Sequence, residues 1–220
     1  MKKTLLIAAG LFLLMTFTPT VKAQEMSTGL DIYSSYIWRG LKFGSGPAFQ
    51  PSIEFSVGGF ALGAWGSFNS SEQEASESDI YTGYGFDLSE NATLSFTVTD
   101  YYFPGSSWTT AESHSLEPMV SLGIGSFTFT AAYMEGLGDD DINGISDIYL
   151  EAAVSAGPVD ITLGGGDGQY TDDGDFNICN IGIGTSKEIK ITDSFSIPVS
   201  GSAILNPATE QFYVVVGISL

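Results

Sequence analysis

Cysteine, histidine and basic residues are scarce in this sequence. Its 220 residues include one Cys, one His and seven Lys or Arg, against 26 Asp or Glu. One cysteine cannot build the framework of a disulfide-rich domain. A formal net charge of −19 excludes the basic surface that nucleic-acid phosphates require, so no nucleic-acid partner is expected. With 13% aromatic and only 15% charged residues, the composition is also not that of a disordered chain.

Long apolar runs are lacking too, apart from one near the N-terminus. Lys2 and Lys3 precede an apolar run of 11 residues, and the segment ends on the small residue Ala23. Because this run is too short to span a bilayer as a helix, residues 1–23 are predicted to be a cleaved secretory signal peptide, with a membrane anchor as the alternative. The exported part, residues 24–220, would keep four basic and all 26 acidic residues, a net charge of −22.

In the exported part, apolar and polar residues alternate with a period of two. Between residues 49 and 57, Phe49, Ile53 and Phe55 fall on one face of a predicted strand and polar side chains fall on the other. Twelve such segments begin near residues 29, 49, 59, 79, 92, 115, 126, 147, 158, 178, 194 and 210. Each has one apolar face and one face of polar or small residues.

The connections between these segments alternate between short and long. The short ones are residues 58–59, 89–91, 125–126, 157–158 and 187–193, and the long ones are 40–48, 69–78, 104–114, 136–146, 167–177 and a shorter 206–209. A membrane barrel sorts its connections in this way, with short periplasmic turns and longer external loops. The predicted fold class is therefore all-β, a transmembrane antiparallel up-and-down barrel of about 12 strands. A soluble β-sandwich, which also alternates, is the alternative.

Aromatic residues on the apolar faces gather near the predicted strand ends, as interfacial girdles do. They are Tyr36, Trp38, Phe49, Phe68, Tyr102 and Tyr133 near the long loops, and Phe60, Phe86, Phe127 and Phe195 near the short turns. The last segment alternates up to Leu220. It resembles the C-terminal strand by which the outer-membrane assembly machinery recognises its substrates, although the usual final residue is Phe.

Five motifs between residues 29 and 124 resemble a known family. They are SYIWRG (35–40), PAFQP (47–51), GAWGS (63–67), DIYTGY (79–84) and YYFPG (101–105). The sequence resembles the TorF-type porins, an outer-membrane family also called Gcw_chp and of unknown function. The resemblance covers about the N-terminal half of the chain. It implies a barrel in the outer membrane of a Gram-negative bacterium and says little about a substrate.

The polar faces would line the lumen of such a barrel. Most inward positions carry Gly, Ser or Thr, so a narrow wet passage can remain, although these residues also ease strand curvature. The predicted inward carboxylates are Asp31, Glu54, Glu117, Glu151 and Asp160. Rings of carboxylates favour cations. Arg39, taken as the only basic residue on a strand, is expected to pair with one of these acids, as a latch or as a selectivity element.

The remaining acidic residues fall in predicted external loops. They are Glu72, Glu74 and Glu77 in the second long loop, Asp139 to Asp141 in the fourth, and Asp172, Asp173 and Asp175 in the fifth. Asp139, Asp141 and Asn143 alternate before Gly144, as in the opening of a calcium loop, and Asp147 follows at the ninth position. The twelfth position is Leu150 and not an acid. Calcium is thus the only cofactor suggested, and a solvated acidic loop is the alternative.

Residues for catalysis are few. His114, near Glu112 and Ser115, is the only imidazole and could serve a hydrolase as general base, but a catalytic set needs an acid that orients the ring, which spacing cannot show. The chain is therefore not expected to be an enzyme. Cys179 is predicted to face lipid. Two functions remain: a channel for passive diffusion of small solutes, preferably cations, and a non-conducting structural or adhesive surface barrel. Expected partners are outer-membrane lipid, small solutes, the assembly machinery and further copies of the chain.

Overall fold

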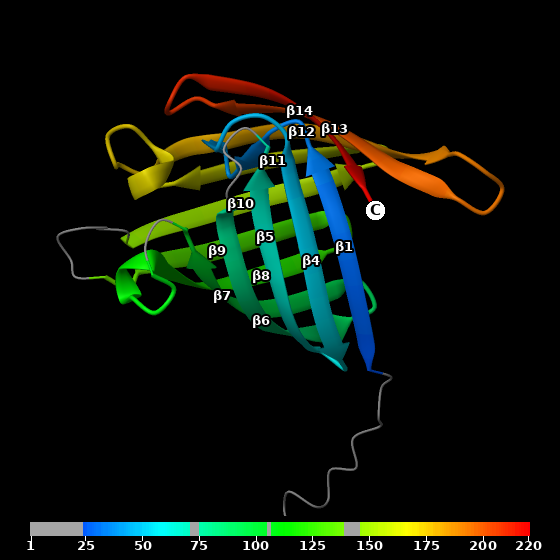
Figure 1. The fold of residues 1–220 in the computed structure, drawn as a ribbon, viewed down its shortest axis with the longest axis horizontal. Coiled ribbons are helices and arrows are strands. Elements are labelled where there is room, and N and C mark those ends of the chain that lie inside the picture. Colours follow the sequence, from blue (N-terminus) through cyan, green and yellow to red (C-terminus); the bar gives the residue numbers. More distant parts are fainter. Residues whose placement is uncertain (1–23, 71–74, 105–106, 139–145) are drawn as a thin grey trace, which may run out of the picture.

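The fold is given by a computed structural model, which describes residues 24–70, 75–104, 107–138 and 146–220. Twelve strands pair in the order β1-β14-β13-β12-β11-β10-β9-β8-β7-β6-β5-β4 and close a barrel (Figure 1). They are β1 (Glu25–Tyr33), β4 (Ala48–Val57), β5 (Phe60–Asn69), β6 (Ala75–Ser89), β7 (Ala92–Tyr102), β8 (His114–Ile124), β9 (Phe127–Gly136), β10 (Ser146–Ala156), β11 (Val159–Gly166), β12 (Asn177–Lys190), β13 (Ser196–Asn206) and β14 (Gln211–Ser219). The predicted fold class is confirmed. The predicted signal peptide, Glu72 and Glu74 lie outside the described residues.

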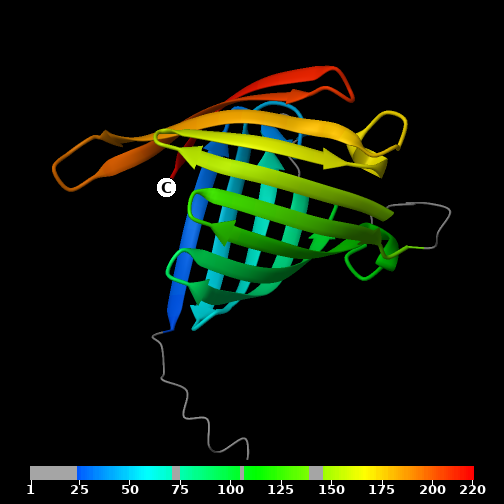
Figure 2. The same ribbon diagram turned by 180° about the vertical axis from the view of Figure 1, so that it is seen from behind.

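Two strands are longer than the alternation predicts. β6 begins at Ala75, so Glu77 lies on a strand and not in an external loop. β12 continues to Lys190 and pairs with β13 as far as Ser196, so the β12–β13 hairpin projects beyond its neighbours (Figures 1 and 2). Lys187 and Lys190 therefore lie on a strand whereas Arg39 lies in a turn, and the prediction that Arg39 is the only basic residue on a strand is wrong. At these strand ends, charged side chains interrupt the apolar alternation of the sequence, but the backbone pairing with the neighbouring strand continues.

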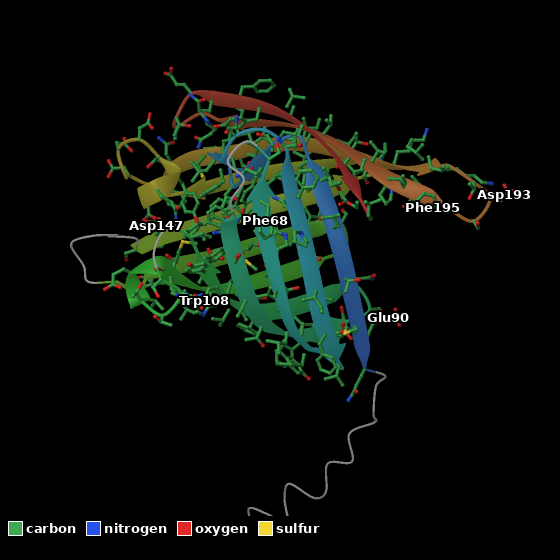
Figure 3. The ribbon with its side chains drawn as sticks, in the orientation of Figure 1. Phe68, Glu90, Trp108, Asp147, Asp193 and Phe195 are labelled. Carbon is green, nitrogen blue, oxygen red and sulfur yellow. The ribbon has the colours of Figure 1, made fainter. Side chains whose placement is uncertain are left out.

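The outward side chains of the barrel are apolar. Ile53, Phe86, Phe129, Ile183 and Val214 are between 46% and 67% exposed, and many similar residues surround them. Outward side chains of this kind cover the barrel in Figure 3. A soluble protein rarely exposes a continuous apolar surface of this size, whereas lipid tails would cover it. The apolar faces predicted from the sequence are thus outward, and the sandwich alternative is wrong because the sheet closes on itself.

The described residues contain two helices, η1 (Ala111–Ser113) and η2 (Gly168–Tyr170), of three residues each. Neither is long or apolar enough to cross a membrane.

The segment between β1 and β4 forms a separate two-stranded hairpin. Its strands are β2 (Tyr36–Trp38) and β3 (Leu41–Phe43). The turn residues Arg39 and Gly40 have φ of 50° and 83°, which suits a two-residue turn with both central residues in the left-handed region. A Cβ on Gly40 would lie 2.0 Å from the carbonyl oxygen of Cys179, so only glycine fits there.

This β2–β3 hairpin lies inside the barrel. Trp38 packs edge-on against Tyr101 of β7, with ring centroids 5.8 Å apart, and Tyr36 lies 5.5 Å from Trp65 of β5. On the other side, Nδ2 of Asn206 in β13 donates to the carbonyl oxygen of Gly40. The prediction of an external loop over residues 40–48 is therefore wrong. Tyr36 and Trp38 are also not part of an interfacial girdle, because they turn inward with the hairpin.

Candidate functional site

Arg39 reaches from the tip of the hairpin to the opposite wall of the barrel. Its two terminal nitrogens donate to the two carboxylate oxygens of Glu117, with Nη2–Oε1 at 2.9 Å, and Nη1 donates to the hydroxyl of Tyr170 at 2.8 Å. The guanidinium carbon lies 4.4 Å from the ring centroid of Trp38 and 4.3 Å from that of Tyr149. The ion pair that the sequence predicts for Arg39 is thus present, with Glu117 as its acid.

The pair is shielded from water. The side chains of Arg39 and Glu117 are 9% and 1% exposed. A planar guanidinium that binds a carboxylate in a bidentate way fixes both groups in orientation as well as distance. Tyr101 adds a hydrogen bond from its hydroxyl to Oε1 of Glu117 at 3.2 Å. Since Arg39 neutralises Glu117, this acid does not offer a free negative charge to a passing ion.

Inward glycines make room for tyrosine rings. A Cβ on Gly63 would lie 2.2 Å from the ring of Tyr81, and one on Gly164 would lie 2.2 Å from the hydroxyl oxygen of Tyr149. The Tyr81 hydroxyl in turn donates to Glu54 at 2.9 Å. Small inward residues therefore serve side-chain packing at these positions, and the sequence reading that they leave the lumen open is wrong there.

Tyr149 also contacts Glu151, another predicted lumen acid. Its hydroxyl donates to Oε2 of Glu151, and Nδ2 of Asn180 donates to the same hydroxyl oxygen at 3.0 Å. The inward tyrosines were missed in the sequence. A signal existed in the alternation itself, because Tyr81, Tyr101 and Tyr149 each fall on the polar face of their strand.

The other predicted lumen acids lie apart from the Arg39–Glu117 pair. Asp160 accepts a hydrogen bond from the Ser155 hydroxyl at 2.6 Å and lines a pocket of about 190 Å³ that Arg39 also borders. Asp31 pairs with Ser219 at the seam where the first and last strands meet. The structure therefore brings one predicted acid into contact with Arg39 and distributes the others along the lumen.

The predicted calcium ligands fall in two places. Asp139, Asp141 and Asn143 lie outside the described residues. Asp147 is buried on β10 near the loop end of the barrel (Figure 3), where its carboxylate accepts a hydrogen bond from the backbone N–H of Gln169 at 3.3 Å. Within the described ranges, no three His, Cys, Asp or Glu side chains gather as a metal site. Calcium binding by this loop stays a prediction.

Cys179 does not face lipid, contrary to the prediction. β11 and β12 pair Gly165 with Ile178 and Gly164 with Asn180, so Cys179 is the extra residue of a β-bulge. The bulge turns the cysteine to the interior, where it is fully buried and packs with Tyr149 and Tyr170. The period-two pattern fails here because one inserted residue exchanges the two faces of a strand.

His114 opens β8 at the loop end of the barrel, on its outer side. Its Nδ1 lies 2.9 Å from Oδ1 of Asp100, and its Nε2 lies 2.8 Å from the carbonyl oxygen of Trp108. Both ring nitrogens are thus engaged, one by the barrel wall and the other by the loop that precedes β8. In this arrangement His114 fastens the loop to β8.

The fold and the interior define a closed 12-stranded barrel with an apolar exterior and an internal hairpin. Residues 19–192 match the Gcw_chp family, described as bacterial protein of unknown function, and the chain belongs to this family. The family description does not include the TorF-type name. No curated protein matches the chain.

Solved outer-membrane barrels are similar to this chain at low identity. The calcium-bound dimer of Salmonella typhi outer membrane phospholipase (OMPLA) is 14% identical, with a TM-score of 0.49 over 92% of this chain and 93% of that one. Pseudomonas aeruginosa OprD is 11% identical, with a TM-score of 0.40 over 90% and 66%. A mutant of Rh. blastica porin is 11% identical, with a TM-score of 0.40 over 79% of this chain and 55% of that one. This chain therefore spans about half of that porin.

Proposed function

We propose that this protein is an outer-membrane barrel through which small solutes diffuse, cations in preference to anions, and that the β2–β3 hairpin constricts its lumen. The observation that carries the proposal is the attachment of the hairpin. It enters at the loop end and is held across the lumen by Arg39 and Glu117. Towards the short turns, small hydroxyl residues such as Ser121 and Thr130 line the wall.

The exterior supports the outer membrane as the location. A closed sheet leaves no unpaired backbone N–H or C=O groups along a strand edge in lipid. An apolar belt around an antiparallel barrel matches the hydrocarbon layer of the membrane. Phe195 at the turn end and Trp108 at the loop end are outward aromatic residues at opposite ends of the barrel (Figure 3). Export by the predicted signal peptide of residues 1–23 agrees with this location.

The preference for cations rests on the carboxylates that no base neutralises. Among the described residues, Arg39 neutralises Glu117, which leaves Asp31, Glu54, Glu151 and Asp160 to set the sign of the lumen. Carboxylates along a narrow wall attract cations and repel anions. The channel function requires no catalytic group.

A specific observation favours a second candidate, the non-conducting surface barrel. The pockets beside the hairpin measure about 230 and 190 Å³, and the second of these is bordered by Arg39 itself. A hairpin that fits this closely can close the lumen altogether. The acidic external loops would then be the functional surface.

Single-channel recording on purified protein in a planar bilayer separates the two candidates. The native chain is expected to give small currents whose reversal potential in a KCl gradient favours potassium. Replacing residues 36–43 with a Gly-Ser linker should enlarge the conductance, since the constriction is removed. A Gly-Ser linker over the exposed residues 172–175 is the control and should leave the conductance unchanged.

The charges are tested in the same recordings. Glu54→Gln together with Asp160→Asn should reduce the preference for potassium. Absence of current in both the native chain and the hairpin variant, with both folded, would leave the structural barrel as the function. Preference for chloride would contradict the assignment of the inward acids.

A further inference from the structure

The β2–β3 hairpin presents two different faces to the barrel. One face carries Tyr36 and Trp38. Their rings contact the rings of Trp65 in β5 and Tyr101 in β7. Because side chains alternate along a strand, Ile37 lies on the opposite face. The two faces of the hairpin therefore meet different parts of the barrel wall.

The aromatic face is packed against the wall. Behind it, Ala132 of β9 and Tyr149 of β10 are only 5% and 2% exposed, and Glu117 of β8 is bound by the hairpin itself. Trp38 and Leu41 pack against the same buried cluster. Packed side chains leave few voids larger than a water molecule, so this side of the hairpin offers no route to a solute.

The opposite face leaves open space. Two pockets of about 230 and 190 Å³ lie along it, and both are bordered by Ile37, Ser202 and Ile204, so they adjoin each other. The first pocket reaches Tyr33, the last residue of β1, at the loop end. The second reaches Asp160, the second residue of β11, next to a short turn. Together they form a crevice that runs from the loop end towards the turn end, which we call the Ile37 crevice.

Small residues keep the wall of the crevice open. Gly182 and Gly184 of β12 and Ser202 of β13 border it and are half-buried. A Cβ on Gly182 or Gly184 would meet its nearest neighbours at 3.5 and 3.7 Å, which is ordinary contact. At Gly63 and Gly164, by contrast, tyrosine rings fill the space that glycine leaves. The absence of side chains therefore widens the lumen on the crevice side only.

The lining of the crevice suits a small cation. Asn180 and Ser202 supply an amide and a hydroxyl, and Asp160 adds a carboxylate. Oxygens of this kind can replace part of the hydration shell of an ion. Lys42 pairs directly with Ile37 across the hairpin, so its exposed ammonium shares the crevice face. Because the repulsion by this ammonium doubles for a divalent ion, monovalent cations pass it more readily.

We infer that solutes pass the hairpin on one side only, through the Ile37 crevice, that the Ile37 side chain sets the size limit, and that the species that pass are small monovalent cations. Among residues 36–43 of the hairpin, only Ile37 borders both pockets, so it stands where they join. The inference rests on the proposed channel function and adds to it a route and a residue that selects by size.

Block by a charged thiol reagent tests the route in single-channel recordings. In a Cys179→Ala background, Ser202→Cys places a thiol in the crevice. A methanethiosulfonate that carries a trimethylammonium group attaches a bulky cation to this thiol. The potassium current should then fall by more than about half, because the attached group occupies the passage and repels further cations.

Ala132→Cys in the same background is the matched control, since its thiol lies behind the packed face of the hairpin. Treatment with the reagent should leave its current unchanged. If Ser202→Cys does not show the heat-dependent gel mobility of a folded barrel, Thr162→Cys on the crevice wall replaces it. An unchanged current in the crevice variant, with modification verified by mass, would overturn the inference and leave the channel function standing, as would block at Ala132→Cys alone. Absence of current in the folded native protein would overturn both.

Reversal potentials with two different cations test the selectivity. With potassium on one side of the bilayer and tetraethylammonium on the other, the native channel should strongly favour potassium. Ile37→Ala should raise the relative permeability of tetraethylammonium severalfold, because it widens the narrowest point. Leu41→Ala removes a side chain of the same size from the packed face and should leave the ratio unchanged. Equal ratios in the native channel and in Ile37→Ala would overturn the role of Ile37.

Calcium against potassium tests the charge of the permeant ion. The native channel should pass calcium less readily than potassium, and Lys42→Met should raise the relative permeability of calcium, because the repulsion is removed. A native channel that favours calcium over potassium would overturn the monovalent class.

Discussion

Arg39 and Glu117 lie out of contact with water, so each charge depends on the other for compensation. Arg39 also adopts φ of 50°, a conformation that side-chain-bearing residues rarely take. The aromatic rings on either side of the guanidinium and the bidentate hydrogen bonds hold this turn in place. At the residue scale, the hairpin is thus fixed by one buried ion pair.

Breaking this pair from one side should be costly. Arg39→Met leaves the Glu117 carboxylate buried and uncompensated, and we expect the free energy of unfolding to fall by about 3–5 kcal/mol. Arg39→Met with Glu117→Met should recover most of this loss, because an apolar pair of similar volume needs no compensation. Urea unfolding in lipid vesicles measures both variants.

Lys42→Met is the control for that cycle, since Lys42 is an exposed cation on the same hairpin. It should change the free energy of unfolding by less than about 0.5 kcal/mol. Equal destabilisation by the single and double Met variants would mean that the charge pair is not what holds the hairpin.

His114 gives the loop end a dependence on pH. Both of its ring nitrogens face acceptors, the Asp100 carboxylate and the Trp108 carbonyl, and only the imidazolium can donate to both. Burial acts to lower the pKa of His114, but the hydrogen bonds to Trp108 and Asp100 outweigh it and hold this pKa above its ordinary value of 6.5. The stabilisation is therefore complete below pH 6.5 and is lost as the pH rises through the folded-state pKa.

An NMR titration of this imidazole, the only one in the chain, should give a midpoint above 6.5. Asp100→Asn should lower that midpoint, because it removes the charge that favours the imidazolium. Backbone amides of residues 107–113 should exchange faster at pH 9 than at pH 6 in the native chain. An unchanged midpoint in Asp100→Asn would contradict the role of Asp100.

At the scale of elements, two features depart from regular strand alternation. The β2–β3 hairpin turns an expected external connection into an internal element, and the bulge in β12 moves Cys179 from the lipid side to the interior. The two meet, because Gly40 at the hairpin turn packs against the backbone of Cys179. The position of the cysteine therefore reports on the position of the hairpin.

Thiol labelling makes this contact testable. A small charged, water-soluble methanethiosulfonate should modify Cys179 slowly in the native barrel, where burial also shields the sulfur. Replacing residues 36–43 with a Gly-Ser linker should accelerate the reaction by more than about tenfold, because the thiol then faces open lumen. Ile178→Cys in a Cys179→Ala background places a thiol on the lipid side and should be insensitive to the linker. Equal rates for Cys179 with and without the hairpin would place that thiol outside the lumen.

At the scale of the molecule, closure depends on the last strand. β14 pairs with β13 over eight residue pairs and with β1 at Asp31 to Tyr33, which joins the two ends of the sheet. Hydrogen bonds then run around the whole circumference, so the barrel unfolds as a unit. The pairing of β1 with β14 is needed before every strand of the barrel has a neighbour on both sides.

The folded barrel should accordingly resist SDS at room temperature and change its gel mobility only after boiling. Val215→Pro removes a ladder hydrogen bond in the middle of β14 and should abolish the heat-dependent form. Asp172→Asn in an exposed loop should retain it. A native chain recovered in the soluble periplasmic fraction, without heat-dependent mobility, would contradict the membrane barrel.

The sequence by itself determined the strand count, the closed architecture and which side chains face outward, because a strand half in lipid must alternate with period two and its loops must sort by side. It also indicated that Arg39 pairs with an inward acid, since a lone base in an acidic lumen needs compensation. Only the tertiary structure decided which acid, and that the segment at Tyr36 to Phe43 folds inward. An inward hairpin and an outward loop have the same local pattern, and the choice depends on contacts with strands distant in the chain. The neighbouring strands likewise determine the bulge at Cys179 and the inward position of Glu77 near the start of β6. The local period of the sequence does not show how those strands pair.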